Sequence, residues 1–247
     1  MPNINDNFFD GHYKKIWKNI IPDELTTKEI DFMLPYFELK EGSKVLDLMC
    51  GYGRHTLALA RKGIAVTAID NLPDYLQEIE KAAQDEKLPV RTIQQSVIDL
   101  ELEQQFDLAI CMGNSIQFFD AAEIKKIFDA VNKSLKAGGQ LLINSWSIAE
   151  IAIKNFKDRT WSEIGEYKFL VESKWQFSPS RIDIRSIIIT PKGETEEKSS
   201  VDHIYSLNEM ENLLHNSGFT LKEVYSIPGR KKFSLGEPRA YIVAVRN

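Results

Sequence analysis

Short apolar runs rich in β-branched residues alternate with longer amphipathic segments through the first half of the chain. The short runs predict strands and the amphipathic segments predict helices, because their apolar positions recur with the periods of those elements. The strand runs are nearly continuous in apolar residues, as expected when helices cover both faces of a sheet. The pattern therefore predicts an α/β fold with a doubly wound parallel sheet. The expected strands are 44–49, 64–69, 90–94, 106–112 and 140–145, and the expected helices are 54–62, 73–87 and 120–136.

The segments before and after this alternation show different patterns of apolar and polar residues. Residues 8–37 favour two helices, the second opened by a capping box at Thr26 and Glu29. Over residues 163–204, polar and apolar residues alternate on both sides of Pro179, which indicates antiparallel hairpin strands with one exposed face. We expect this stretch to form a small inserted sheet.

After the insertion the α/β pattern returns. Ser206 and Glu209 predict a second capping box, and Gly218 predicts the end of the helix that they open. Two further strands are expected at 221–226 and 240–245. These elements would complete a Rossmann-like mixed sheet with helices on both faces.

Composition and charge narrow the possible partners. A chain of 247 residues that is 43% hydrophobic buries roughly 70–75% of its unfolded surface and needs no metal or disulfide to fold. The formal net charge of −5 lacks the basic excess on which nucleic-acid binding depends, so we expect no nucleic-acid partner. The two cysteines, Cys50 and Cys111, form no CxxC pair or Cys/His cluster, which favours a reducing cytoplasmic setting and no metal site. No apolar run approaches about 18 residues, so no membrane partner is expected.

A glycine-containing loop follows the first strand of the predicted sheet. Asp47 lies within that strand, and Gly51 and Gly53 lie in the turn before the next helix. Glycine permits a sharp bend and lets a ligand approach the main chain closely. Asp70 ends the next strand, where a carboxylate can accept hydrogen bonds from ribose hydroxyls. The combination predicts an adenosine-type ligand at the carboxyl edge of the sheet.

The loop also disfavours two kinds of nucleotide. The dinucleotide fingerprint GxGxxG requires a third small residue beside the pyrophosphate, and Thr56 stands at that position. The spacing GxxxxGK[ST] of triphosphate-binding loops is absent. An NAD-linked oxidoreductase is therefore the less favoured alternative from another class of enzyme.

The string LDLMCGYG at residues 46–53 resembles the first motif of the class I S-adenosylmethionine-dependent methyltransferases. FDLAI at 106–110 and LKAGGQL at 135–141 resemble later strand motifs of that family, with Ala137 in place of the usual proline. The resemblance implies a seven-stranded sheet whose last strand is antiparallel, with the cofactor bound between the first and fourth strands. GNS at 113–115, with aromatic residues after it, looks like the small-molecule branch, which includes glycine and amino-sugar N-methyltransferases.

Carried over position by position, the resemblance implies which residues hold S-adenosylmethionine and its product S-adenosylhomocysteine. Gly51 and Gly53 would line the methionine portion, Asp47 would lie near the amino group, and Asp70 would bind both ribose hydroxyls. Leu72 would flank the adenine, where the Ser96 hydroxyl and the Val97 amide replace the family's usual acid. The other expected cofactor-binding residues are Met112, Tyr13 and Arg54.

The acceptor side follows from the same resemblance. Asn114, Phe118, Trp17 and Tyr205 are the expected residues of the substrate pocket. Methyl transfer depends largely on aligning the acceptor behind the methyl carbon, so a dedicated base is optional. His203 and His12 are the candidate bases for an acceptor that must lose a proton.

These expectations divide the chain into three parts. Residues 1–40 would supply helices that cover the cofactor site, residues 41–148 and 205–247 the cofactor-binding domain, and residues 149–204 a sheet that roofs the substrate. The expected protein is a cytoplasmic monomer or homodimer that methylates a nitrogen or oxygen atom of a small molecule. A protein or RNA methyltransferase and a non-catalytic S-adenosylmethionine-binding protein are the alternatives.

Overall fold

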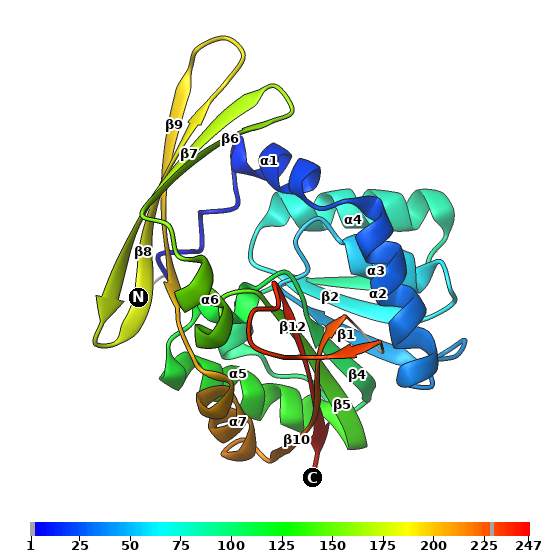
Figure 1. Ribbon diagram of the computed structural model, residues 1–247. Helices are drawn as coiled ribbons and strands as arrows, with labels where there is room; N and C mark the ends of the chain where they lie inside the picture. Colours follow the sequence, from blue (N-terminus) through cyan, green and yellow to red (C-terminus); the bar gives the residue numbers. More distant parts are fainter. Residues whose placement is uncertain (1–2, 228–229) are drawn as a thin grey trace.

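The computed structural model describes residues 3–227 and 230–247, and its centre is an eight-stranded mixed sheet (Figure 1). The strand order is β11-β10-β12-β5-β4-β1-β2-β3. Strands β1 to β5 run parallel, β12 runs antiparallel to β5, and β10 runs antiparallel to β12. The bounds are β1 Lys44–Leu48, β2 Ala65–Asp70, β3 Val90–Gln94, β4 Phe106–Cys111, β5 Leu135–Ser145, β10 Phe219–Ile227, β11 Lys231–Lys232 and β12 Ala240–Arg246.

The predicted doubly wound sheet is confirmed, with one strand more than the seven expected. The additional strand is β11, a two-residue segment that pairs with β10 at the edge of the sheet. All five strands predicted between residues 44 and 145 are present. The central strands β1 and β4 are buried on both faces, as their consecutive apolar residues require, whereas the edge strand β3 is only half-buried.

Helices cover both faces of this sheet, as the apolar strands require. On one face, Met33 and Leu59 from two helices pack against Val45 of β1. On the other face, Ile127 and Met210 pack in the same core cluster as Leu46, the next residue of β1. The helices of the domain are α2 Asp23–Tyr36, α3 Arg54–Ala60, α4 Pro73–Glu86, α5 Ala121–Ser134, α6 Ala149–Asn155 and α7 Leu207–His215.

The strand order creates a crevice at one end of the sheet. From β1 the chain proceeds outward to β2 and β3 and then returns to place β4 on the other side of β1. Connections therefore leave the carboxyl ends of β1 and β4 in opposite directions, and such a switch point is where open α/β sheets bind ligands.

A separate four-stranded antiparallel sheet stands beside the main sheet (Figure 1). Its central hairpin pairs β7 with β8 around the turn that contains Pro179, as the alternating pattern predicted. The short helix α1, Tyr13–Ile20, packs on this sheet, where Tyr13 and Ile16 join Ile188 in one apolar cluster. The strands are β6 Arg159–Ile164, β7 Tyr167–Phe177, β8 Ser180–Ile189 and β9 Thr195–His203.

The prediction of a capping box at Thr26 and Glu29 is wrong. Helix α2 begins three residues earlier, at Asp23, so Thr26 and Glu29 lie inside it and are buried. Glu29 is instead turned toward Arg54 and His55 of α3, which bind its carboxylate. The box predicted at Ser206 and Glu209 is confirmed, with reciprocal hydrogen bonds at the start of α7.

No helix in the described part of the chain combines the length and the apolar character that crossing a membrane requires. The division into residues 1–40, a cofactor-binding domain and residues 149–204 stays a prediction.

Candidate active site

A cavity lies at the carboxyl ends of β1, β2, β3 and β4, where the crevice was expected. Its wall comes from the loop after β1, the end of β2, and the short 3-10 helices η1 (Val97–Asp99) and η2 (Ser115–Phe118) with the segments before them. Many residues proposed from the sequence line it. They are Asp47, Gly51, Arg54, Asp70, Leu72, Ser96, Val97, Met112, Phe118 and Trp17.

The two glycines of the loop have different roles in the structure. Gly51 lines the cavity with φ of +54°, and a Cβ there would meet no atom within 4 Å. Gly53 precedes α3 with φ of +78°, and a Cβ there would lie 2.5 Å from Ile79 of α4. Gly51 thus leaves open space at the cavity, whereas Gly53, which was also expected to line it, lets α3 and α4 pack closely.

Asp70 connects the end of β2 to the glycine loop. One carboxylate oxygen accepts a hydrogen bond from the Gly51 amide at 2.8 Å, and the other accepts one from the Leu72 amide at 3.0 Å. Burial raises the pKa of the Asp70 carboxyl, and these amide hydrogen bonds oppose the rise. Each oxygen keeps a further lone pair, so the carboxylate can still accept hydrogen bonds from a ligand.

Asp47 lies deeper, with its side chain 2% exposed. The Thr56 hydroxyl donates a hydrogen bond of 2.6 Å to the Asp47 carboxylate. Burial raises the pKa of Asp47, while the charges of His55 and Arg54 and the Thr56 hydrogen bond act in the opposite direction. Thr56 therefore supports an acid of the site, at the position where a dinucleotide fold needs a small residue.

A buried ionic cluster around Glu29 holds Arg54 at the cavity. Arg54 Nη1 lies 2.5 Å from Glu29 Oε2, and His55 Nε2 lies 2.9 Å from the same oxygen. The Tyr241 hydroxyl donates to the other oxygen at 2.7 Å, and Arg54 also donates to the Thr26 hydroxyl. Burial alone would raise the pKa of Glu29, but hydrogen bonds and charges from His55 and Arg54 lower it to about 2. Sequence reasoning missed this role of Glu29.

The side of the cavity expected to hold adenine contains Leu72, Ser96 and Val97. The Ser96 hydroxyl accepts a hydrogen bond from the Ile98 amide and so caps η1. A hydroxyl that accepts in this way still has a proton to donate. No carboxylate of η1 lines the cavity, in agreement with the absence of the usual acid from the sequence.

Neither histidine proposed as a base lines the cavity. His203 is half-buried at the end of β9, with its ring stacked on Tyr205. His12 lies before α1, and its backbone amide donates to Glu196 of β9. Both belong to the contact between the inserted sheet and its neighbours, and the structure gives no support to a role for either as a base.

Three other proposed residues also lie outside the lining. Tyr13 is buried against Phe8 and the inserted sheet. The Tyr205 hydroxyl donates to the Phe119 carbonyl. Asn114 is 2% exposed and supports the segment after β5, because its side chain bonds the amides of Trp146 and Ser147.

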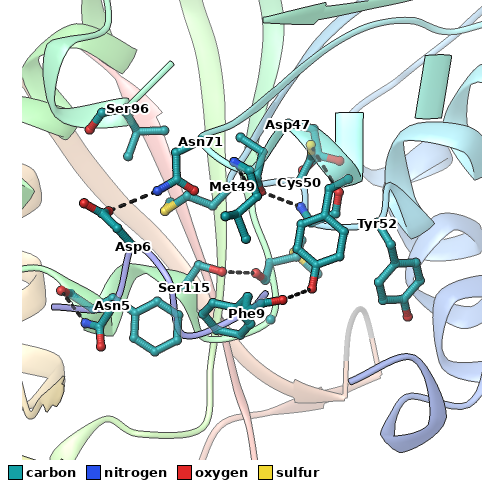
Figure 2. A pocket seen from close by; sticks show the side chains of 18 of the residues that line it. Asn5, Asp6, Phe9, Asp47, Met49, Cys50, Tyr52, Asn71, Ser96 and Ser115 are labelled. Atoms are coloured by element: carbon teal, nitrogen blue, oxygen red, sulfur yellow. Dashed lines mark hydrogen bonds between the residues drawn. The ribbon is translucent and has the colours of Figure 1, made fainter. Parts of the chain in front are cut away.

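The segment of residues 3–12, which we call the N-terminal arm, covers the cavity through Asn3, Asn5, Asp6 and Phe9. Residues 1–40 were expected to cover the cofactor site with helices, whereas this part of the cover precedes the first helix, α1. Asn5 binds the backbone of Val201 in β9 through two hydrogen bonds, of 2.9 and 3.0 Å. Figure 2 shows Asp6 bonded to Asn71 at one edge of the cavity and Phe9 on the opposite side from Ser96. The run of Asn and Asp residues at 3–7 was the only signal in the sequence, and such runs are common in loops.

The residues that the structure describes contain no group of His, Cys, Asp and Glu side chains that could hold a metal ion. The cavity is lined by carboxylates, one paired guanidinium, neutral polar side chains such as Asn71 and Ser96, and apolar side chains. This set suits a polar nucleoside with a charged tail.

Comparison with known proteins agrees with this geometry. Residues 45–139, which span β1 to the first part of β5, match the family described as "Methyltransferase domain". The chain is a methyltransferase that uses S-adenosylmethionine. The "Putative methyltransferase YqeM" of Bacillus subtilis is 28% identical over 216 residues, which cover 82% of each chain.

Two solved structures share the fold of this methyltransferase over nearly its whole length. An S-adenosylmethionine-dependent methyltransferase from Clostridium acetobutylicum has a TM-score of 0.80 at 20% identity, covering 96% of both chains. CalS10, an amino pentose methyltransferase from Micromonospora echinaspora with S-adenosylmethionine bound, has a TM-score of 0.72 at 17% identity, covering 98% and 99%. The shared fold therefore extends beyond the matched domain and includes most of the inserted sheet.

Proposed function

We propose that this protein transfers the methyl group of S-adenosylmethionine to a nitrogen or oxygen atom of a small molecule. The observation that supports a small acceptor is the cover over the cavity. Phe9 of the N-terminal arm and Trp17 of α1 line it together with Phe118. A cavity covered in this way suits a compact molecule better than a polypeptide or an RNA strand.

The chain's own side chains fit the cofactor. The Asp70 carboxylate, held by two amides, suits the ribose hydroxyls, and the open space at Gly51 lets the methionine portion approach the main chain. Arg54, already oriented by Glu29, suits the methionine carboxylate, and Asp47 suits the amino group. Leu72 and Val97 suit the adenine ring.

S-adenosylmethionine supplies an electrophilic methyl group on a sulfonium sulfur. The protein's part is to hold the acceptor in line with that group and to exclude water, which in favourable cases corresponds to effective molarities of about 10⁵–10⁸ M. The aromatic side chains of Phe9, Trp17 and Phe118 provide the dry wall. A neutral amine acceptor needs no base before transfer, and no base is assigned.

The chemistry of the rest of the chain agrees with this proposal. The formal charge of −5 does not favour a polyanionic RNA acceptor. The CalS10 neighbour is described as acting on an amino pentose, which supports a small amine or hydroxyl compound. Cys50 and Cys111 are free thiols, which fits action in the reducing cytoplasm.

An acceptor screen with methyl-labelled S-adenosylmethionine tests the proposal. We expect label to enter at least one member of a panel of small amines and phenols, with S-adenosylhomocysteine formed in equal amount. Label found only in added protein or RNA would establish the macromolecular alternative. Tight binding of S-adenosylhomocysteine without turnover of any acceptor would favour a non-catalytic binding protein.

A further inference from the structure

A row of aromatic rings leads from the cavity, which Phe118, Phe9 and Trp17 line, to Trp146 beside it. The ring of Phe118 lies 5.1 Å from that of Phe9, and Phe9 lies 6.2 Å from Trp17. Trp17 then lies 5.9 Å from Trp146, the residue that follows β5. Trp17 also covers the backbone after β4, because a Cβ on Gly113 would touch its ring at 3.4 Å. The row therefore forms a continuous apolar wall that begins inside the cavity.

A guanidinium group ends this row. Arg239 precedes β12 and stands one residue beyond the paired residues Ala240 and Ser145, directly across from Trp146. Its Cζ lies 5.6 Å from the centre of the Trp146 ring. Stacking of this kind leaves the edges of a guanidinium able to bind a planar anion. Part of the Arg239 guanidinium also faces the Tyr241 hydroxyl, so an anion would take the remaining N–H groups.

The charge of Arg239 is not balanced by a neighbouring carboxylate. It forms no salt bridge with any residue in the described ranges 3–227 and 230–247. The nearby acid, Glu29, already binds Arg54, His55 and the hydroxyl of Tyr241. A half-buried guanidinium beside an aromatic wall attracts an anionic group from solution.

We propose that Trp17, Trp146 and Arg239 form the acceptor subsite, and that it takes a small ring compound with an anionic substituent. The ring lies along the two indoles, and the anionic group pairs with the guanidinium. This placement rests on the proposed function, since it assumes that the methyl acceptor enters beside Trp17. It excludes cationic acceptors whose charge would have to lie against Arg239.

Matched ring compounds test the subsite directly. 4-Hydroxybenzoate and its neutral counterpart 4-hydroxybenzamide are titrated into the full-length protein, with and without saturating S-adenosylhomocysteine, by calorimetry or tryptophan fluorescence. We expect the anion to bind at least about tenfold more tightly than the amide, as about 1.4 kcal/mol of charge pairing would produce. Phenyl phosphate, titrated in parallel, shows whether the subsite prefers a carboxylate or a phosphate.

Three variants test whether Arg239 causes the tighter binding of the anion. Arg239→Gln should abolish it, Arg239→Lys should keep part of it, and Arg91→Gln on the far edge strand β3 should leave it unchanged. Equal binding of the anion and the amide, or an unchanged preference in folded Arg239→Gln, would overturn the subsite. If S-adenosylhomocysteine does not bind but the Arg239-dependent preference is present, the proposed function fails and the anion subsite stands.

Discussion

The glycine-loop edge of the cavity and the N-terminal arm that covers it are held together in different ways. At the glycine-loop edge, Asp70 binds the amides of Gly51 and Leu72, which are at most 19 residues away along the chain. On the covered side, Asn5 binds Val201, which is 196 residues away. The first region can form once neighbouring strands pair, whereas the second requires the inserted sheet to be folded and docked.

A carboxylate lies close to each region, and the two carboxylates are stabilised differently, Glu29 being buried and Asp202 half-buried. Glu29 supports the glycine-loop edge and is paired with cations, so its pKa is lowered to about 2 against the effect of burial. Among the described residues, the side chain of Asp202 in β9 receives hydrogen bonds only from Ser147 and Asn114, and burial raises its pKa to about 6. Folding therefore favours the ionised form of the Glu29 carboxyl and the protonated form of the Asp202 carboxyl.

The largest expected effect is the loss of Glu29. Glu29→Ala leaves the guanidinium of Arg54 buried without its partner, and we expect the free energy of unfolding to fall by about 3–5 kcal/mol. Urea denaturation at neutral pH measures this. Glu29→Gln keeps the side-chain volume but not the charge, so its free energy of unfolding should lie between those of Glu29→Ala and the wild type. A loss below about 1 kcal/mol in Glu29→Ala would mean that the cluster contributes little.

The second test uses the titration of Asp202. Because the folded state holds its proton up to about pH 6 and the unfolded state loses it near pH 3.8, the folded state binds more protons between these values. Stability should therefore fall as pH rises through that window, by up to about 3 kcal/mol. Asp202→Asn should remove this slope in urea titrations taken from pH 4 to pH 7. A slope that persists in the variant would assign it to another group.

The third test loosens the arm. Asn5→Ala removes the two hydrogen bonds to Val201 and one to the Phe118 carbonyl. The free energy with which the arm docks on the rest of the protein should become less favourable by about 1–3 kcal/mol. Amide hydrogen exchange of residues 3–12 should quicken, while exchange in β1 and β2 stays unchanged. Asn7→Ala is the control, since the side chain of Asn7 bonds no residue that the structure describes. Equal exchange in both variants would contradict the anchoring role of Asn5.

The smallest expected effect concerns the ribose assignment. Asp70→Ala should weaken S-adenosylhomocysteine binding by at least about tenfold, or about 1.4 kcal/mol, in calorimetry. Because Asp70 also binds the Gly51 amide, Asp70→Asn is the companion variant that preserves an acceptor for the loop. Asp74→Ala, in the exposed first turn of α4, is the control and should bind S-adenosylhomocysteine with the affinity of the wild type. Unchanged affinity in Asp70→Ala would refute the assignment.

The contrast between the two regions explains what the sequence could predict. The strands and the placement of Asp47, Gly51 and Asp70 at the cavity follow from apolar periodicity and from the rule that parallel strands bind ligands at their carboxyl ends. That residues 1–40 cover the cofactor site was predicted, but the docking of an arm before α1 was not, because its anchor Asn5 binds Val201 on β9 and nothing local to residues 3–12 specifies that partner.

Two misplaced expectations have a related cause. The pattern that predicted a capping box at Thr26 and Glu29 also occurs inside a helix when the acid is needed by a distant cation, here Arg54. The alternation that predicted an inserted sheet over residues 163–204 does not tell which face of that sheet meets the cavity, so it could not place His203 of β9. In both cases the deciding contact is tertiary, and periodicity carries no information about it.

The most direct test of the central claim is a calorimetric titration of the wild-type protein with S-adenosylhomocysteine and, separately, with NAD. The account predicts that S-adenosylhomocysteine binds at one site per chain and that NAD gives no binding heat. Binding of NAD without binding of S-adenosylhomocysteine would contradict it.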